Sequence, residues 1–592
     1  MPVSSTYSEY RSRLFMNPIF TRTLSLLTLT LALGACATHP VQPPPPPAPV
    51  VDANPDDDSA PARPFDKDTL YDLMLAEFAA DRGRADITLT RYAKQAKSTH
   101  DPNVLERATE ISQYVNAQPL TLELADMWAK ADPGSLQAHY LLVLNSLRNQ
   151  RFDQTIPALD DLLKLDPDAD LQQIFISAVP PTREGREKLL VALDGVPVAY
   201  SHNGQVYFAR ALMQDQNGDH QLALSNIRAA EKEHPSNVSD ILLESQILLS
   251  LGQEQASEER LARAVKEQPN SRALRQSYAR ALAHADKYEQ ARAQYSLLVA
   301  QQPDDGDTVL LLAILAIEHH DDATAKINLG KLVDLDQHTD EAHYYLGTIA
   351  RDAKDTDTAL SELEQVEPGN IFLVARQEMA DILLDANDLS AAREKLSAAR
   401  SLAPDMASQL YTIEADLLTR AKQPGAAFDL LNGALKMDPK NELLIYSRAM
   451  TAEKLDNMEV FEGDMHTLLE HDPNNATALN ALGYTLAERT DRLDEAQGYI
   501  SKALALRPND PAIIDSMGWV RFRQGDSKDA LDLLQKAYTL MPDDEIAAHV
   551  GEVLWAMGRK DEARKVWSDA LTRVPDSEFI IGTRSRLDQP KH

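Results

Sequence analysis

The sequence is poor in cysteine and in aromatic residues, and each shortage excludes a class of protein. Cys36 is the only cysteine among 592 residues, so the chain can form neither an internal disulfide nor a multi-cysteine metal site. Aromatic residues make up 6% of the chain and hydrophobic residues 43%, a balance that suits a helical protein rich in alanine and leucine better than a β-rich one. The fold must therefore be held together by packing alone.

Basic residues are also scarce. The chain has 59 lysines and arginines against 91 aspartates and glutamates, which gives a net charge of −32. A chain this acidic is repelled by the phosphate backbone of nucleic acids, and no basic stripe with interleaved aromatic residues is present. The composition therefore argues against a nucleic-acid partner and favours neutral or basic ones.

The sequence lacks a long apolar run as well. Its clearest one, Leu24 to Leu33, has about ten residues, whereas a helix that crosses a bilayer needs roughly 20. Arginines at positions 11, 13 and 22 precede the run, which is the pattern of a secretory signal peptide. Because residues 16–36 alone have the length of a normal signal, either Met1 or Met16 can be the start.

The end of this leader gives the lone cysteine a role. Leu33-Gly34-Ala35-Cys36 is similar to the bacterial lipobox, in which an aliphatic residue and two small residues precede a lipidated cysteine. An incidental cysteine would not bring the charge, the apolar run and the small residues with it. We therefore expect a lipoprotein signal over 1–35 and stable anchoring of the mature chain through an acylated Cys36.

Residues 36–64 form the next segment, which is rich in proline. An unbroken run covers 43–47, and acidic residues follow at 56–58. Proline favours the extended polyproline II form and offers no backbone donor, so the segment cannot pack. At ~3.1 Å per residue it could span up to roughly 80 Å. A spacer is the favoured interpretation, and a ligand for a proline-binding groove is the alternative.

From residue 65 the chain repeats with a period close to 34. The clearest marker is a proline that closes each unit, with Gln337 holding one place in the series: Pro235, Pro269, Pro303, Pro368, Pro404, Pro439, Pro473, Pro508, Pro542 and Pro575. Small and large residues recur at fixed offsets before these prolines, as in the unit with Gly518, Gly525, Ala530, Leu534, Ala537 and Pro542. Over residues 66–577 this resembles the tetratricopeptide-repeat superfamily, whose unit is a helix–turn–helix of this length.

The resemblance implies an all-α superhelical solenoid of about 11–14 helix–turn–helix units. We predict N-terminal helical repeats over 65–167, a degenerate segment over 168–200, the main repeat array over 201–577, and a capping helix with a tail over 578–592. Two units of the array depart from the pattern. Phe461 replaces a small alanine, and the unit 338–368 is three residues short.

No motif for chemistry stands out. HExxH, P-loop and GxSxG patterns are absent, and no spacing places a nucleophile beside a base. His319-His320-Asp321-Asp322 could suggest metal ligands, but adjacent side chains on a helix do not face each other, and the motif falls at a predicted turn. We therefore expect no catalytic site, no metal and no cofactor. An enzyme with an unrecognised site is the remaining class.

Function is then expected on the surface. In such solenoids the first helix of each unit lines a concave groove, and consensus positions place the following residues at or near it: Gln276, Arg280, Tyr344, Arg351, Asn480, Tyr484, Trp519, Arg523, Glu552 and Trp555. Aromatic residues and arginines are typical anchors of interfaces. The alternative is that Tyr484, Trp519 and Trp555 are packed between helices. The lysine and asparagine pattern with which some relatives clamp a peptide carboxylate is absent.

An apolar stripe at helical spacing opens the repeat region, formed by Leu70, Leu73, Met74 and Phe78. The favoured interpretation buries this stripe against the second helix of the first repeat. The alternative is an amphipathic helix that is offered to a partner's groove.

The whole layout resembles proteobacterial outer-membrane tetratricopeptide lipoproteins, through LYDLMLAEFAADRGR (70–84), ALGYTLAERTDRLDEA (481–496) and DSMGWVRFRQGDSKDAL (515–531). A well-understood member is the adaptor of a periplasmic carboxyl-terminal processing protease, which also binds the peptidoglycan hydrolases that the protease degrades. Alanine at position 37, in place of the aspartate that retains lipoproteins in the inner membrane, implies the outer membrane. A scaffold of an exopolysaccharide or secretion machine is the alternative.

Overall fold

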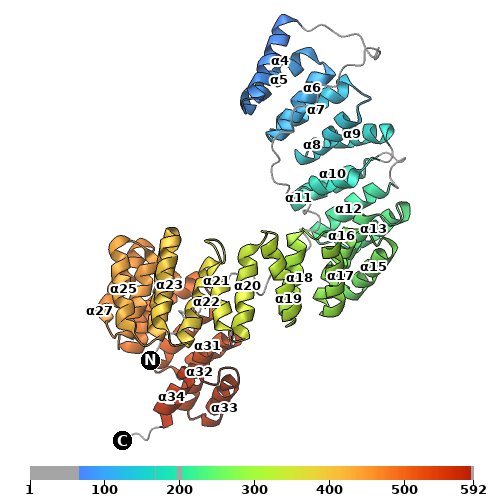
Figure 1. The fold of residues 1–592 in the computed structure, drawn as a ribbon. Helices are drawn as coiled ribbons and strands as arrows, with labels where there is room; N and C mark the ends of the chain where they lie inside the picture. Colours follow the sequence, from blue (N-terminus) through green and yellow to red (C-terminus); the bar gives the residue numbers. More distant parts are fainter. Residues whose placement is uncertain (1–65, 167–168, 197–202, 589–592) are drawn as a thin grey trace. The chain divides into compact units, whose positions relative to one another are not determined.

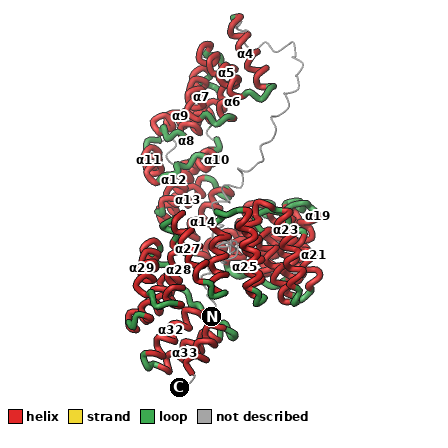
Figure 2. Tube along the Cα trace, turned by 90° about the vertical axis from the view of Figure 1, so that its left-hand side faces the viewer, coloured by secondary structure: helices red, strands yellow, loops and turns green. Residues whose placement is uncertain are grey.

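The computed structural model describes residues 66–166, 169–196 and 203–588, and all regular elements in these ranges are helices (Figure 2). The described residues fall into two compact units, divided in the chain between His319 and His320. We call these the N-terminal unit and the C-terminal unit. Among the helices described, none is long and apolar enough to cross a membrane.

The N-terminal unit is a row of antiparallel helix pairs that follow one another in chain order (Figure 1). Its helices are α4 (Lys67–Ala80), α5 (Ala85–Thr99), α6 (Pro102–Tyr114), α7 (Gln118–Ala131), α8 (Leu136–Arg148), α9 (Phe152–Leu165), α10 (Leu171–Ser177), α11 (Arg183–Leu193), α12 (Gly204–Asn217), α13 (His220–Glu233), α14 (Val238–Ser250), α15 (Glu254–Glu267), α16 (Arg272–His284), α17 (Tyr288–Gln301) and α18 (Gly306–Glu318).

The C-terminal unit continues the same plan. Its helices are α19 (Asp322–Asp334), α20 (Thr339–Asp352), α21 (Thr356–Glu364), α22 (Phe372–Asp385), α23 (Leu389–Leu402), the short 3-10 helix η2 (Pro404–Met406), α24 (Ala407–Arg420), α25 (Pro424–Met437), α26 (Glu442–Lys454), α27 (Met458–His471), α28 (Ala476–Arg489), α29 (Leu493–Leu506), α30 (Pro511–Arg523), α31 (Ser527–Leu540), α32 (Asp544–Ala556), α33 (Lys560–Leu571) and α34 (Glu578–Asp588).

The predicted fold class is confirmed. The described ranges contain 31 α-helices, and thirteen pairs of consecutive helices pack closely, from α4–α5 to α32–α33 but without α10–α11 and α18–α19. The pair α10 and α11 falls in the segment predicted to be degenerate, and its helices have only 7 and 11 residues. The thirteen closely packed pairs fall within the predicted range of 11–14.

The prolines that close the units also separate one pair from the next. In most pairs the second helix ends two residues before its proline, as α27 does at His471 before Pro473. Proline cannot continue the helix. A polar side chain just after the proline then caps the first helix of the next pair. Asn475, for example, accepts a hydrogen bond from the Ala478 amide at 3.0 Å. A Pro-x-Asn or Pro-x-Asp sequence thus ends one helix and begins another.

The two helices of a pair approach most closely at one small residue of the first helix. A Cβ added at Gly518 would lie 2.7 Å from Cγ of Leu534, and one at Gly483 would lie 2.6 Å from Cγ1 of Ile500. At Gly551 an added Cβ would overlap the indole ring of Trp567. Glycine is needed at these positions because the partner side chain fills the space that a methyl group would take.

The predicted departures from the repeat have visible local results. The shortened unit has a second helix, α21, of only 9 residues, against 14 in α23 and α25. Phe461, which replaces a small alanine, is fully buried in the core around α26 to α28. The short α10 is tied to the array by Nε2 of Gln172, which donates to Oδ1 of Asp240 at 2.6 Å.

The glycine contacts predict a site-specific loss of stability. Gly551→Ala should destabilise the α32–α33 pair by about 1–3 kcal/mol, because the indole ring of Trp567 must move out of a packed core. Hydrogen exchange of the α32 amides in the full mature chain measures this loss as a lower free energy of local opening.

Gly498→Ala on α29 is the matched control. A Cβ at Gly498 meets no atom within 4 Å, so this exchange should be neutral or stabilise its helix by up to ~1 kcal/mol. Equal effects of the two substitutions would mean that the close approach at Gly551 does not limit the packing.

Candidate functional site

The predicted groove residues lie on the first helices of their pairs, as expected from the repeat pattern. They are Gln276 and Arg280 on α16, Tyr344 and Arg351 on α20, Asn480 and Tyr484 on α28, Trp519 and Arg523 on α30, and Glu552 and Trp555 on α32. Those on α16 belong to the N-terminal unit, and the others belong to the C-terminal unit. Their surroundings differ strongly from helix to helix.

On α28, α30 and α32 the inner side chains form a buried polar cluster. Trp519 stacks on the ring of His549, with 4.3 Å between the ring centres, and its Nε1 donates to Oε2 of Glu488 at 2.8 Å. The Tyr484 hydroxyl donates to Oε1 of Glu545 at 3.2 Å and lies 3.4 Å from Nε2 of His549. We call Tyr484, Asp515, Trp519, Glu545 and His549, all less than 9% exposed, the inner cluster.

His549 is the charge at the centre of this cluster. Burial lowers its pKa, but the Asp515 carboxylate, 3.0 Å from Nδ1, together with Glu545 and Glu488, more than offsets burial and raises the pKa to about 9. The imidazolium form donates from Nδ1 to Asp515. Burial, followed by the charge of Glu545, holds the pKa of Tyr484 well above its ordinary value. The cluster at neutral pH is therefore a charged, mutually hydrogen-bonded network.

The structure decides between the two readings of Tyr484 and Trp519. Both are buried, at 8% and 5% exposure, and both make hydrogen bonds inside the protein, so packing between helices is right and an open-groove position is wrong. Trp555 is half-buried. Its ring lies beside the buried Trp567 and carries Lys560 Nζ 4.6 Å from its centre.

Arg523 and Glu552 also have structural partners. Nη1 of Arg523 donates to the carbonyl oxygens of Ala487, at 2.5 Å, and Glu488, at the end of α28. Glu552 forms a two-pronged ion pair with Arg586 of α34, at 2.5 and 2.6 Å. The guanidinium groups thus join neighbouring repeats. Glu552 is buried at 6% exposure, whereas Arg523 is half-buried.

The other predicted groove residues lie on α16, α20 and α28. Gln276 and Arg280 are half-buried, and Tyr344 is buried at 9% exposure. Arg351 is exposed and pairs with Asp352, at 2.7 Å, and with Glu378 of α22. Asn480 is buried at 3% exposure, and its side-chain oxygen has no hydrogen-bond partner among the described residues.

Sequence reasoning missed three members of the inner cluster, namely Asp515, Glu545 and His549. They lie on the same inner helices as the predicted residues. The available signal was the recurrence of polar residues at inner positions of α28, α30 and α32, where a packed core would favour apolar ones. Their mutual pairing follows only from the three-dimensional winding of the helices.

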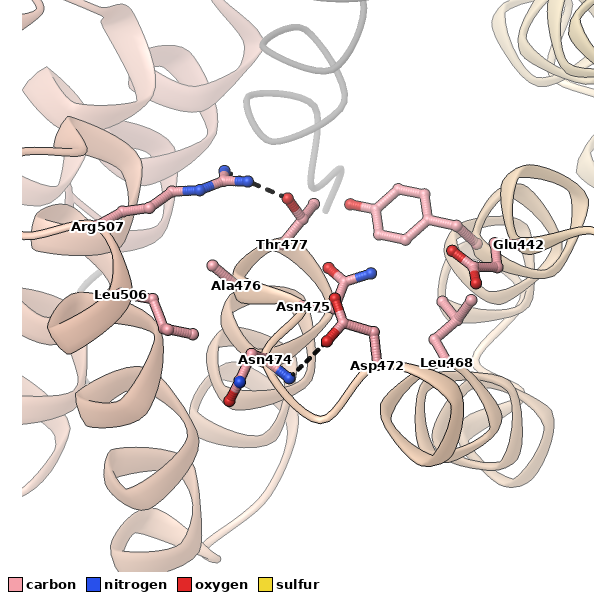
Figure 3. Close-up of a pocket in the computed structure, with 10 residues that line it drawn as sticks. Glu442, Leu468, Asp472, Asn474, Asn475, Ala476, Thr477, Leu506 and Arg507 are labelled. Carbon is pink, nitrogen blue, oxygen red and sulfur yellow. Dashed lines mark hydrogen bonds between the residues drawn. The ribbon is translucent and has the colours of Figure 1, made fainter.

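A pocket of about 340 Å³ lies at the junction of α26, α27, α28 and α29 (Figure 3). Glu442 and Asp472 line one side, and Arg507 reaches in from the other, where its Nη1 lies 3.4 Å from the Thr477 hydroxyl. Asp472 accepts the Asn474 amide at 2.9 Å, and Asn475 caps α28. The polar groups of the pocket thus serve largely to hold the turn between two repeats.

The motif His319-His320-Asp321-Asp322, at the turn after α18, makes local structural contacts. His319 stacks on Tyr288, with 4.6 Å between ring centres, and Asp321 caps α19 by accepting the Thr324 amide at 3.1 Å. Within the described ranges no three histidine, cysteine, aspartate or glutamate side chains gather as metal ligands would.

The apolar stripe on α4 departs from the favoured prediction. Leu70, Met74 and Phe78 are 52%, 52% and 51% exposed, and Tyr71 beside them is 63% exposed. Leu73 is half-buried against the core. Burial of the stripe against the second helix is therefore wrong for these three side chains, because α4 turns its opposite face to α5. The stripe is an open apolar surface on a helix, as the alternative interpretation required.

A series of helical hairpins is typical of repeat scaffolds, which bind their partners through extended surfaces. The family model described as tetratricopeptide repeat matches residues 242–306, 378–442 and 463–511. TPR repeat-containing protein PA4667 of Pseudomonas aeruginosa is 38% identical over 535 residues, which cover 90% of each chain. The protein belongs to the tetratricopeptide-repeat family, whose members bind protein partners and are typically non-catalytic scaffolds.

Two further likenesses are weaker. Cellulose synthase operon protein C of Pseudomonas fluorescens is 29% identical over 174 residues, which cover 27% of this chain and 13% of that protein. Among solved structures, yeast Tom70 aligns with 88% of this chain and 99% of its own, at 14% identity and a TM-score of 0.31.

The charge on His549 predicts a pH-dependent stability. Because its folded pKa is about 9, against an ordinary 6.5, the stabilisation is complete below pH 6.5 and is lost as the pH rises towards 9. His549→Gln should remove up to about 3 kcal/mol at pH 6 and flatten the dependence between pH 6.5 and 9. Thermal unfolding followed by circular dichroism across this range measures the change.

His471→Gln provides the matched control. His471 also pairs with a carboxylate, Glu442 at 2.6 Å, but its side chain is 67% exposed, so solvent screens the pair and little change is expected. The same pH slope in wild type and His549→Gln would contradict a charged histidine in the inner cluster.

Proposed function

We propose that this protein is a lipid-anchored scaffold on the periplasmic face of the outer membrane. It binds a carboxyl-terminal processing protease together with the peptidoglycan hydrolases that the protease degrades, and so promotes their proteolysis. The single observation that carries the proposal is the open apolar face of α4, in a chain whose segments 70–84, 481–496 and 515–531 resemble the adaptor lipoproteins. The charge and repeat architecture are compatible with this role.

The face of α4 has the form of a docking helix. Leu70, Met74 and Phe78 follow one another at intervals of four residues, so they line up along one side of the helix. Three large apolar side chains, each more than half exposed, are unfavourable in water and would gain roughly 1 kcal/mol each when a partner covers the exposed half. A partner with an apolar groove gains most of its affinity from such a row.

The place of α4 in the chain supports an anchored adaptor. It begins at Lys67, directly after the predicted proline-rich spacer, so a partner held on it would stay within the reach of the tether. Cys36 and the spacer lie outside the described residues. The lipid anchor and the outer-membrane location therefore rest on the sequence pattern alone.

One comparison favours a second candidate. The likeness to cellulose synthase operon protein C supports a scaffold of an exopolysaccharide or secretion machine. This likeness covers only 27% of this chain, whereas the likeness to TPR repeat-containing protein PA4667 covers 90%. The protease-adaptor role is preferred because the α4 segment is among those that carry its resemblance.

Affinity capture from detergent-solubilised envelope tests the partners. With the mature protein as bait and mass spectrometry as the readout, a carboxyl-terminal processing protease and cell-wall hydrolases should be recovered together. Recovery of export or polysaccharide-synthesis components in their place would favour the second candidate and end the protease proposal.

The same capture with altered bait tests the role of α4. Met74→Ser with Phe78→Ser removes two of the exposed apolar side chains, and recovery of the protease should fall at least ~10-fold. Leu222→Ser on α13 is the matched control, because Leu222 is 59% exposed but lies outside the stripe. If both baits retained the protease, α4 would not be its docking surface.

Substitution of the predicted lipidated residue tests the anchor. Cys36→Ala removes the thiol that would carry the lipid, so the protein should shift from the membrane fraction to the soluble fraction or remain as an uncleaved precursor. Fractionation with immunodetection separates these outcomes. A mature Cys36→Ala protein that still sediments with membranes would refute lipid anchoring.

A further inference from the structure

The helix α4 is attached to the protein mainly by polar and small residues, with Leu73 half-buried against the core, and it turns Leu70, Met74 and Phe78 outwards. Its buried positions are Thr69, Asp72, Ala76 and Ala79, whereas the stripe described above is open. Helices of a globular array normally bury their apolar stripe and expose their polar one. Since α4 buries no large apolar side chain completely, the hydrophobic contribution to its attachment is small.

Polar contacts to α5 supply the attachment instead. The Asp72 carboxylate is 12% exposed and accepts three donors: Nη1 of Arg91 at 2.5 Å, Nζ of Lys94 at 2.7 Å, and Nε2 of Gln95 at 2.7 Å. We call this group the Asp72 hub.

Three hydroxyl groups add to the contact, and the first is that of Tyr92, which donates to Oε1 of Glu77 on α4. The Thr69 hydroxyl donates to Oε1 of Gln95 at 3.0 Å, beside the Asp72 hub. The Thr88 hydroxyl donates to the Ala76 carbonyl at 3.2 Å. The contact between α4 and α5 is thus a set of directional polar bonds. Thr69, Asp72, Thr88 and Gln95 are buried. The cations Arg91 and Lys94 are 35% and 70% exposed, so salt can screen their ion pairs with Asp72.

The next contact along the chain is more apolar, since α4 contributes only Ala76 as a buried member of the core, with Leu73 packed against it. The helix α5 buries Tyr92, Ala93 and Ala96, and α6 buries Val104, Leu105 and Ala108, all within one continuous apolar core. Separation of α5 from α6 would expose that core. The boundary between weak and strong attachment therefore lies between α4 and α5.

We propose that α4 undocks from α5 as a separate element while α5 and the following helices stay folded, and that the Asp72 hub is the fastening. A helix of 14 residues is marginal in water on its own, so the undocked segment loses helical protection until a partner covers its apolar side. This goes beyond the proposed function, because undocking is a property of the chain alone, whichever partner receives the helix.

Hydrogen exchange of the full mature chain, read by mass spectrometry on peptides from α4 and α6, tests this proposal. In the wild type the α4 amides should exchange at least ~10-fold faster than those of α6, relative to their intrinsic rates, and faster still when NaCl is raised from 0.05 to 0.5 M. Asp72→Asn keeps the shape of the side chain but removes its charge. It should speed exchange in α4 a further ~10-fold and leave α6 unchanged.

Two further variants make the result specific. Arg91→Gln with Lys94→Gln removes the hub's cations from the side of α5 and should speed α4 exchange in the same way. Asp126→Asn on α7 breaks an exposed ion pair with Lys130 and should change nothing in α4. Equal protection of α4 and α6, or α4 exchange that is unaffected by Asp72→Asn, would overturn the proposal, and neither outcome depends on a protease partner.

Discussion

The whole array depends on the distance between the two helices of each pair. At Gly347, Gly483, Gly518 and Gly551 the first helix has no side chain where Leu363, Ile500, Leu534 and Trp567 of the second helix press against it. This close approach sets where the next pair stacks, and through it which residues of the first helices face inwards. A small residue at one position per repeat therefore governs the surroundings of side chains many residues away, including those of the inner cluster.

The inner helices of the C-terminal unit use polar groups to hold neighbouring repeats. Arg489 pairs with Glu453, Arg523 holds the end of α28, and Arg586 pairs with Glu552. Each guanidinium spans one repeat boundary, and the two acids, Glu453 and Glu552, are almost fully buried. Buried ion pairs contribute less to stability than their geometry suggests, but loss of one partner is costly. Their effect here is to fix how one repeat sits on the next.

The fold could be predicted from the sequence because its determinants are local. The recurring proline, its capping residue and the glycine contact all lie within one 34-residue period. The site could be predicted only in part. Consensus positions show that Tyr484 and Trp519 face inwards. They do not show that both side chains contact His549, which lies 65 residues beyond Tyr484 in the sequence. For α4, the spacing of Leu70, Met74 and Phe78 is the same whether the stripe is buried or open. Asp72 determines which face of α4 is buried, because the groups that donate hydrogen bonds to its carboxylate lie on α5.

The contact between Tyr484 and α32 also bears on how such arrays change in length. In most of a repeat array each unit touches only its neighbours, so a whole repeat can be added or lost with little effect elsewhere. The hydroxyl of Tyr484 on α28 passes the intervening repeat and bonds Glu545 on α32. Duplication or deletion of the pair α30–α31 would separate these partners or bring the wrong ones together. The number of repeats at this place is therefore fixed by chemistry, whereas repeats joined only to their neighbours are free to vary.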